Sequence, residues 1–252
     1  MSQRVCRHFR GPRTGLFLAT LLLACSATAQ DPPANETSTT VPPGRTSYLG
    51  RKIAQTMHYT GAQWLIRDAR EREERCSMTL AHLGVRAGMT ICDMGCGNGY
   101  YSLKLAKLVT PSGRVLAVDV QPQMLYMLRQ RAEQAGVENI TPILGSIHNP
   151  RLPTGSCDLI LMVDVYHELS HPRRMLAAMR KALKPNGEIV LVEYREEDPK
   201  VPIKPLHKMS KKQILKEMSA NGFKLSRQFD GLPWQHLMAF QRAPQWQSDL
   251  PK

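Results

Sequence analysis

The sequence predicts an α/β fold with a doubly wound, mostly parallel sheet of about seven strands that ends in an antiparallel strand pair. Short apolar runs alternate with helical patterns from Gly84 onward, which is typical of a parallel sheet covered by helices. The last two apolar runs have no helix between them, so they pair as antiparallel neighbours at the sheet edge. A chain of 252 residues, 42% of them hydrophobic, is long enough for one well-buried domain with peripheral segments.

Each element is bounded by turn or capping residues. The expected strands are Met89–Met94, Arg114–Val120, Thr141–Gly145, Cys157–Val165 and Glu188–Tyr194, followed by KLSRQF and QHLMAFQR. The expected helices are YYSLKLAKLV, Pro122–Ala135, His171–Leu183 and Met209–Asn221. Turns are expected at Pro111-Ser112-Gly113 and at Lys184–Gly187, because glycine and proline interrupt regular structure there. Ser210 suits the start of the last helix and Gly222 its end.

A helical segment precedes the sheet, with apolar residues spaced around the charged run RDAREREER between Tyr59 and Leu83. We interpret this run as a solvated helix face with charge pairs four residues apart. The chain is therefore expected to divide into a signal peptide at 1–29, a disordered linker at 30–47, an N-terminal helical segment at 48–83, the main domain at 84–243 and a flexible tail at 244–252.

The amino terminus has the pattern of an export signal. Four arginines and no acid occur among the first 30 residues, and the apolar run LFLATLLLA is too short to span a bilayer but suits a secretory signal. Cleavage after Ala29 and lipidation of Cys25 after Ala24 are both open, and the second gives a lipid anchor. The predicted location is periplasmic or membrane-anchored. A downstream start, for example at Met57, instead predicts a cytoplasmic protein.

Charge and cysteine usage exclude several function classes. The net charge of +13 comes with no run of five or six basic residues, so nucleic acid is not an expected partner. The six cysteines do not form a disulfide framework in a chain of this size. Cys92 and Cys96 lack a second Cys/His pair at ligand spacing, so no metal site is expected.

The stretch DMGCGNG lies between a predicted buried strand and a helix, a position where glycines bring the backbone close to a ligand. Its glycines are Gly95, Gly97 and Gly99. A dinucleotide loop needs a small residue where Tyr100 stands, which disfavours a nicotinamide or flavin cofactor. Asp119 ends the next strand, where a carboxylate can accept hydrogen bonds from both ribose hydroxyls. The alternative is that Asp119 only caps the following helix.

From Gly84 to Arg242 the chain resembles the class I S-adenosylmethionine-dependent methyltransferases, closest to bacterial small-molecule or ubiquinone-biosynthesis-like domains. ICDMGCGNGYYS resembles the first motif of that family, VLAVDV the ribose-binding strand end, CDLILMVDVYHEL the fourth-strand motif and LKPNGEIVLVEY the fifth. The resemblance implies a Rossmann-like methyltransferase fold with S-adenosylmethionine as cofactor. It implies a set of cofactor-binding residues: Asp93, Gly95, Gly97 and Gly99 at the methionine end, Asp119 at the ribose, and Ser146 or Ile147 near the adenine. Asp164, at the end of the fourth strand, is a further cofactor-binding candidate.

Candidate substrate residues follow the fourth and fifth strands, because ligands of such sheets bind beyond the carboxyl ends of the strands. After the fourth strand, Tyr166, His167 and Glu168 are the catalytic candidates, with His167 suited to act as a general base. After the fifth strand and its proline-rich loop, Tyr194, Arg195 and His207 are the substrate-binding candidates. For the loop residues, the alternative is a purely structural role at the surface.

These observations predict a methyltransferase acting on a small or lipid-like acceptor at oxygen, nitrogen or carbon. One alternative is an exported, non-catalytic protein that binds S-adenosylmethionine or S-adenosylhomocysteine, since export separates the protein from a cytosolic cofactor. A second alternative, a nicotinamide oxidoreductase on a related sheet, is disfavoured by Tyr100. The sequence identifies neither the acceptor nor the oligomeric state.

Overall fold

The structure, a computed structural model, describes residues 41–246. The predicted signal peptide at 1–29, the lipidation site at Cys25, the linker up to residue 40 and the tail from residue 247 lie outside the described residues. Among residues 41–246, no helix combines the length and the apolar character needed to cross a membrane.

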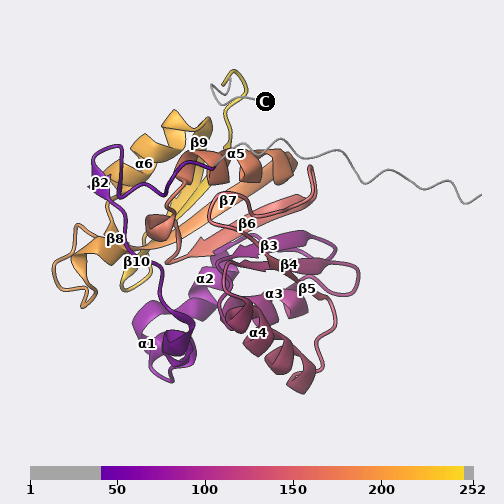
Figure 1. The fold of residues 1–252 in the computed structure, drawn as a ribbon. Helices are drawn as coiled ribbons and strands as arrows, with labels where there is room; N and C mark the ends of the chain where they lie inside the picture. The colour runs from indigo at the N-terminus through magenta and orange to yellow at the C-terminus, as the bar shows by residue number, and fades with distance from the viewer. Residues whose placement is uncertain (1–40, 247–252) are drawn as a thin grey trace, which may run out of the picture. The chain divides into compact units, whose positions relative to one another are not determined.

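A mostly parallel sheet forms the centre of the described domain (Figure 1), with the strand order β5-β4-β3-β6-β7-β10-β9. The parallel strands are β3 (Thr90–Met94), β4 (Arg114–Asp119), β5 (Ile140–Leu144), β6 (Cys157–Val163) and β7 (Leu183–Arg195). The remaining strands are β10 (Gln235–Arg242) and β9 (Phe223–Phe229), both antiparallel to their neighbours, and the two-residue β8 (Lys208–Met209), which pairs with β7. The predicted fold class, including its antiparallel C-terminal pair, is confirmed.

Helices cover both faces of the sheet, because the central strands present apolar side chains on both sides. Every residue of β3 is buried. Below the sheet in Figure 1 lie α2 (Cys76–His82), α3 (Tyr100–Leu108) and α4 (Pro122–Gln134); above it lie α5 (Pro172–Ala182) and α6 (Lys211–Ala220). Ser210 caps α6 as expected, since its side chain accepts a hydrogen bond from the Gln213 backbone N–H.

Strand β7 is longer than predicted, since the turn expected at Lys184–Gly187 is part of the strand. Leu183 already pairs with Cys157 of β6, and the register shifts before Leu159. A strand bulge thus absorbs the proline and the glycine that suggested a turn.

The N-terminal segment at 48–83 is not helical throughout. It begins in the small hairpin β1 (Ser47–Tyr48) and β2 (Arg51–Lys52), and its helical part is divided into η1 (Tyr59–Ile66), α1 (Arg70–Glu74) and α2. Arg75, with φ of 49°, separates α1 from α2. The charged run is only partly a solvated face, because Glu71, Arg72 and Arg75 are exposed whereas Arg70 is 4% exposed and Glu74 is fully buried.

Both ends of the described chain are held against the domain, contrary to the expected linker and tail. The backbone N–H of Arg45 donates to the Ser170 carbonyl over 2.9 Å, and the His171 ring donates to the Pro42 carbonyl over 2.8 Å. At the other end, Trp246 stacks with Arg180, the guanidinium carbon lying 5.2 Å from the ring centroid. Residues 42–47 of the predicted linker and residues 244–246 of the predicted tail therefore include contacts with the domain.

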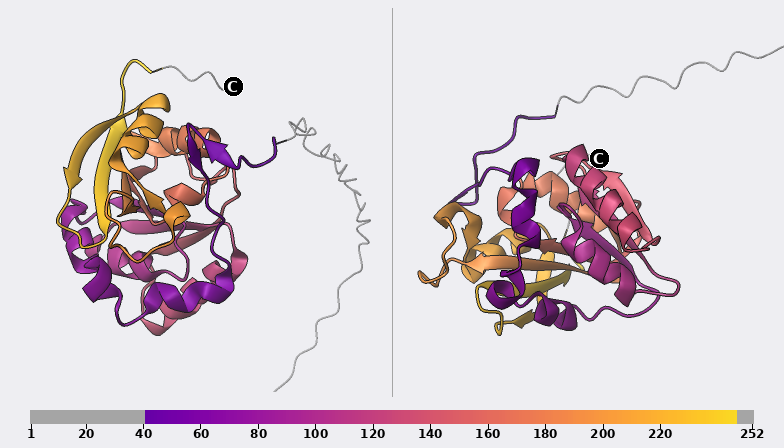
Figure 2. Two further views of the ribbon diagram at one scale, coloured as in Figure 1. Left: turned by 90° about the vertical axis from the view of Figure 1, so that its left-hand side faces the viewer. Right: turned by 90° about the horizontal axis from the view of Figure 1, so that it is seen from below.

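The carboxyl ends of the parallel strands meet at one edge of the sheet, between β4 on one side and β7 on the other. From β3 the chain continues to β4 and β5 on one side of β3, and then crosses to β6 on its other side. The carboxyl ends of β3 and β6 therefore lie at the topological switch point, where such folds bind ligands. The N-terminal segment runs past this edge, as the two views of Figure 2 also show.

Candidate active site

A cavity of about 730 Å³ opens at this edge, within the range of ~300–1,000 Å³ usual for small-molecule sites. Its wall combines the loop after β3, the end of β4, the residues after β6, and η3 (Pro205–His207). The N-terminal segment closes one side with Met57, Trp64, Leu65 and Arg70. Of the residues predicted for the site, those lining the cavity are Gly95, Gly97, Asp119, Ser146, Asp164, His167, Glu168, Tyr194 and His207.

The glycine loop leaves no room for side chains where it meets the cavity. A Cβ on Gly95 would lie 2.6 Å from Val165, and one on Gly97 would lie 2.5 Å from Leu65. Both glycines have positive φ, which other residues rarely adopt. The loop is fixed by backbone hydrogen bonds from Gly95 and Cys96 to the Val118 carbonyl over 2.8 and 3.0 Å. At this loop the cavity is therefore lined by backbone without side chains, and hydrogen bonds hold that backbone in place.

Two other residues of the loop motif lie behind the cavity wall. Asp93 is buried and accepts a hydrogen bond from the Ser102 hydroxyl over 2.6 Å, and burial raises its pKa to about 6. Gly99 begins α3 with φ of 85°, and a Cβ there would lie 2.8 Å from Leu128. The structure thus gives both residues a supporting position under the loop, and their contact with a ligand stays a prediction.

Asp119 joins the end of β4 to the glycine loop. Its two carboxylate oxygens accept hydrogen bonds from the backbone N–H groups of Gly97 and Gln121, each over 2.9 Å. A carboxylate has about four acceptor positions, so capacity remains for the hydroxyls of a ligand at the cavity. Burial raises the pKa of Asp119. The alternative role as a helix cap is not observed, because Gln121 is the N-cap of α4 and the bond from its N–H to Asp119 lies in the turn before the helix.

Side-chain amides hold the N-terminal segment over the glycine loop, which sequence reasoning did not detect. Gln121 donates to the Met57 carbonyl over 2.9 Å and accepts from the Tyr59 N–H over 2.8 Å. Asn98 donates to the Ala62 carbonyl over 2.9 Å. No spacing in the sequence signals these contacts, because each amide lies more than 30 residues from its partner.

Asp164 has a strained and incompletely bonded position beside the cavity. Its φ is 55°, and one carboxylate oxygen accepts from Gln235 over 2.8 Å while the other has no partner among the described residues. Burial, and then the charges of Glu74 and Glu193, raise its pKa well above the usual value.

The charged pair of Arg70 and Glu74 supports the same region. Arg70 binds Glu74 over 2.8 Å and donates to the Leu65 carbonyl over 2.7 Å, and Tyr194 donates to Glu74 over 2.9 Å. Burial opposes ionisation of Glu74, but Arg70 and Arg67 together lower its pKa. The charged run interpreted as solvent-facing therefore brings a paired guanidinium to the cavity wall.

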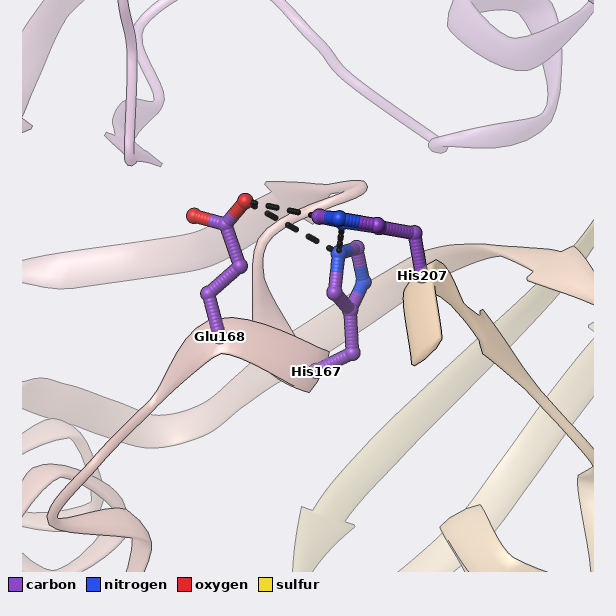
Figure 3. Close-up of side chains that lie close together, drawn as sticks. All are labelled: His167, Glu168 and His207. Carbon is purple, nitrogen blue, oxygen red and sulfur yellow. Dashed lines mark hydrogen bonds and ion pairs between the residues drawn. The ribbon is translucent and has the colours of Figure 1, made fainter. Parts of the chain in front are cut away.

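Two imidazoles and a carboxylate that line the cavity lie close together (Figure 3). His167 Nε2 lies 3.0 Å from His207 Nδ1, and one oxygen of Glu168 lies 3.9 Å from each of these nitrogens. His167 and Glu168 belong to η2 (Tyr166–Glu168) and His207 to η3. We call these three side chains the histidine cluster.

Glu193, on β7, fixes the orientation of His167. Its fully buried carboxylate accepts from His167 Nδ1 over 2.6 Å and from the Tyr166 backbone N–H over 2.8 Å. Burial alone lowers the pKa of His167, but the charge and hydrogen bond of Glu193 outweigh it, so the net shift is upward. The Nδ1–H tautomer that this bond favours directs a lone pair of Nε2 into the histidine cluster.

The two partners of His167 are shifted toward their neutral forms. Burial raises the pKa of Glu168 to about 7. Burial and the neighbouring positive charges of His167 and Lys204 lower the pKa of His207. Within the histidine cluster, His207 and Glu168 are thus shifted toward their neutral forms, whereas His167 is shifted toward its protonated form.

Two predicted site residues lie away from the cavity wall. Tyr166 is fully buried, and its hydroxyl donates to Glu217 over 2.8 Å. Arg195 donates to the backbone carbonyls of Pro233 and Asp230, in the loop before β10. Their side chains thus hold elements together around the site, and neither is placed where the sequence prediction required it.

Cys92 and Cys96 are buried thiols, and burial raises the pKa of each well above its usual value. Cys92 belongs to the hydrophobic core. Cys96 is buried against Leu125 and Leu128.

Comparisons with known proteins agree with this geometry. Residues 86–243 match a family model described as a methyltransferase domain. Over 116 residues the chain is 30% identical to the ubiquinone/menaquinone biosynthesis C-methyltransferase UbiE of Ralstonia pickettii, covering 46% of this chain and 47% of the relative. Over 126 residues it is 33% identical to a tRNA U34 carboxymethyltransferase of Desulfotalea psychrophila, covering 49% and 38%. The match spans less than half of each relative.

Among solved structures, a SAM-dependent methyltransferase from Aquifex aeolicus aligns with a TM-score of 0.69 and 23% identity, over 73% of this chain and 98% of that one. At this identity the likeness supports the fold. The family match covers most of the chain and coincides with the sheet, the glycine loop and the cavity. The chain therefore belongs to the methyltransferase domain family, of the class I S-adenosylmethionine-dependent type.

Proposed function

We propose that this protein transfers the methyl group of S-adenosylmethionine to a small, lipid-like acceptor bound beside the histidine cluster. The observation that carries the proposal is that two chemically different groups of residues line one cavity: the glycine loop with Asp119 and Asp164, which we call the cofactor end, and the histidine cluster, which we call the acceptor end. Methyl transfer requires a donor site and an acceptor site that share one dry space, because the two substrates react in line.

The residues present fit the cofactor of the family. Gly95 and Gly97 line the cavity with backbone at positive φ, which suits close approach of the methionine end, and Asp119 retains acceptor capacity for the ribose hydroxyls. The unpartnered, buried oxygen of Asp164 suits the cofactor's ammonium group, which supplies the donors it lacks. When bound, the cofactor supplies an electrophilic methyl group on a positively charged sulfur.

The acceptor end is suited to an apolar molecule with one polar group. Leu169, Met175 and Ile203 line it together with the histidine cluster. Apolar walls with a few convergent polar groups are usual for sites that bury a small ligand and fix its orientation. The distant likeness to enzymes of ubiquinone and menaquinone biosynthesis supports a ring-containing, hydroxylated acceptor, for example a quinol or a phenol.

Binding is tested first, by isothermal titration of the full chain with S-adenosylmethionine, S-adenosylhomocysteine and NADH. We expect one equivalent of each sulfur ligand to bind and NADH not to bind, because Tyr100 occupies the position where dinucleotide loops need a small residue. Absence of binding by both sulfur ligands contradicts the proposal.

Transfer is tested next, with the isotope-labelled methyl group of S-adenosylmethionine and a panel of quinols, phenols and keto acids. We expect label in at least one acceptor. Tight binding of the sulfur ligands without transfer to any acceptor in the panel favours the non-catalytic binding protein instead.

We also propose that the protein is exported through its amino-terminal segment, on the strength of the arginine-rich start and the apolar run that follows it. Mass spectrometry of the mature protein from its native cell tests this. A first residue at Gln30 indicates cleavage after Ala29, and a lipidated first residue at Cys25 indicates a lipoprotein. An intact terminus, or a start at Met57, contradicts export.

A further inference from the structure

The three side chains of the histidine cluster have the composition and spacing of a metal site. One ligand atom from each of His167, Glu168 and His207 lies within 4.8 Å of the others. The separations are 3.0 Å between the two nitrogens and 3.9 Å from each nitrogen to the carboxylate oxygen. Atoms bound to one ion at about 2.0–2.2 Å stand roughly 3.0–3.5 Å apart. Small side-chain movements therefore suffice to coordinate an ion.

The protein also holds the first ligand in the orientation that a metal requires. Metal-binding histidines usually donate their second ring N–H to a carboxylate, which fixes the tautomer and strengthens the ligand nitrogen. Glu193 accepts from His167 Nδ1 over 2.6 Å and is itself fully buried and bound to the Tyr166 N–H. This bond places the ring proton of neutral His167 on Nδ1, so Nε2 is the nitrogen directed toward an ion. Binding of an ion would displace the proton that Nε2 and His207 Nδ1 share across 3.0 Å.

The remaining coordination positions open into the cavity, which all three side chains line. Two imidazoles and one carboxylate with open positions are typical of Zn²⁺ and of non-haem Fe²⁺, whereas Mg²⁺ and Ca²⁺ prefer oxygen ligands only. Three protein ligands with room for a further ligand is the arrangement of catalytic sites, while structural zinc sites are closed by four protein ligands.

We propose that His167, Glu168 and His207 bind one divalent transition-metal ion, Zn²⁺ or Fe²⁺, whose open positions hold the methyl acceptor through an ionised oxygen. The second half of this inference rests on the proposed function, and it narrows the acceptor to hydroxy or keto-enol compounds. An ion favours the oxyanion because it stabilises the charge left when the acceptor's proton goes to solvent. Glu193 is a positioning residue, since it acts through His167.

Metal binding is measured without any methyl transfer. The full chain, treated with a chelator and dialysed, is titrated with Co²⁺, and the visible absorption bands of the bound ion are recorded before Zn²⁺ is added in competition. We expect one equivalent of Co²⁺ at this site with the spectrum of a four- or five-coordinate ion, displaced by one equivalent of Zn²⁺. A wild-type chain that gives no such spectrum and binds no Zn²⁺ overturns the proposal.

Substitutions of the proposed ligands test which side chains bind the ion. His207→Ala is suited to this because the side chain is 31% exposed, so its loss leaves the core unchanged. We expect His207→Ala and Glu168→Gln each to lose the Co²⁺ spectrum and at least 100-fold in Zn²⁺ affinity, and Glu193→Gln to lose about 10–100-fold. The matched control is His82→Gln, an exposed histidine on α2, which we expect to bind both ions as the wild type does. Equal affinity in His207→Ala and wild type shows that the ion is elsewhere.

Different results would contradict the proposed metal site and the proposed methyltransferase function. Binding of S-adenosylhomocysteine, followed by calorimetry, stays unchanged in His207→Ala if the cofactor and metal sites are separate, as inferred. Metal binding with no methyl transfer to any hydroxy or keto-enol acceptor overturns only the proposed role of the ion. Methyl transfer that persists at the wild-type rate after complete removal of metal also overturns that role and leaves the methyltransferase function intact.

Discussion

The two ends of the cavity are built in different ways. The cofactor end depends on backbone, because Gly95 and Gly97 stand between β3 and α3 in one short stretch and are held by bonds to the neighbouring strand β4. The acceptor end depends on side chains, because His167 and His207 meet from positions 40 residues apart. The first end is thus defined by its backbone conformation, and the second by the side-chain atoms that it presents.

The difference predicts how each end responds to substitution. At the cofactor end an added side chain is harmful because it fills space, and the conformation of the loop excludes most residues regardless of their chemistry. At the acceptor end the loss of a side chain is harmful because a ligand or proton acceptor disappears while the backbone stays in place. Substitutions at the two ends should therefore separate binding of the cofactor from turnover.

The largest effect is expected for Gly97→Val at the cofactor end. Its Cβ would lie 2.5 Å from Leu65, and a β-branched residue is strained at φ of 54°. We expect no measurable binding of S-adenosylmethionine by calorimetry, a loss of more than 100-fold. Gly136→Ala is the matched control, since Gly136 has a similar φ of 62° but nothing within 4 Å of its Cβ position. Retained binding in Gly97→Val would mean that the loop does not contact the cofactor.

The acceptor end is tested by His167→Ala, for which we expect turnover to fall by about 10²–10⁴-fold with unchanged affinity for S-adenosylhomocysteine. His167→Asn accompanies it, because the asparagine amide can still donate to Glu193 and so avoids an unpaired buried carboxylate. The measurements are initial rates with a labelled methyl donor and calorimetry on the same preparations. Wild-type turnover in both variants removes His167 from the catalytic residues.

The sequence predicted the cofactor end better than the acceptor end for physical reasons. Close approach of backbone to a ligand requires glycines in consecutive positions, so DMGCGNG is visible as a contiguous pattern. Asp119 was predictable because the end of a strand fixes where its side chain lies. His207 follows a proline-rich loop whose path no periodicity determines, so its meeting with His167 was not visible, and neither was the metal-like spacing that results.

The prediction that differs most from the structure is the solvent exposure of Arg70 and Glu74. A charged run with pairs four residues apart is usually a solvated helix face, and only tertiary structure decides otherwise. Here Tyr194 and Arg67 complete the hydrogen bonds of Glu74 inside the protein, so its burial is tolerated. The roles of Gln121 and Asn98 were not predicted for a related reason, because a side-chain amide that binds a distant backbone group leaves no pattern in the sequence.

A smaller effect, on stability, is expected under the cofactor end for Asp93→Asn. The pKa of Asp93 is raised by burial from 3.8 to about 6, so the folded state binds a proton more tightly than the unfolded state does. Its contribution to stability is therefore full below pH 4 and is lost as the pH rises to 6, by up to about 3 kcal/mol. We expect the free energy of unfolding of Asp93→Asn, relative to wild type, to increase by that amount between pH 4 and pH 7 in denaturant titrations.

Ser102→Ala is the companion variant for this prediction. Ser102 donates to Asp93, and that hydrogen bond partly offsets the effect of burial on the pKa. Without it the pH range in which stability is lost should move to higher pH. A difference between Asp93→Asn and wild type that does not change with pH contradicts the raised pKa.

The smallest effect is expected for Gln121→Leu, which tests the one part of the cofactor end that depends on side chains. Gln121 makes two hydrogen bonds to the backbone of the N-terminal segment, at Met57 and Tyr59, and each is worth about 1 kcal/mol. Losing both should weaken binding of S-adenosylhomocysteine by about 10–30-fold, because the segment that carries Leu65 no longer closes over the loop. Gln130→Leu, on the exposed side of the same helix, is the matched control. Equal affinities in the two variants would show that apolar contacts alone hold the N-terminal segment over the glycine loop, and that the cofactor end depends on backbone throughout.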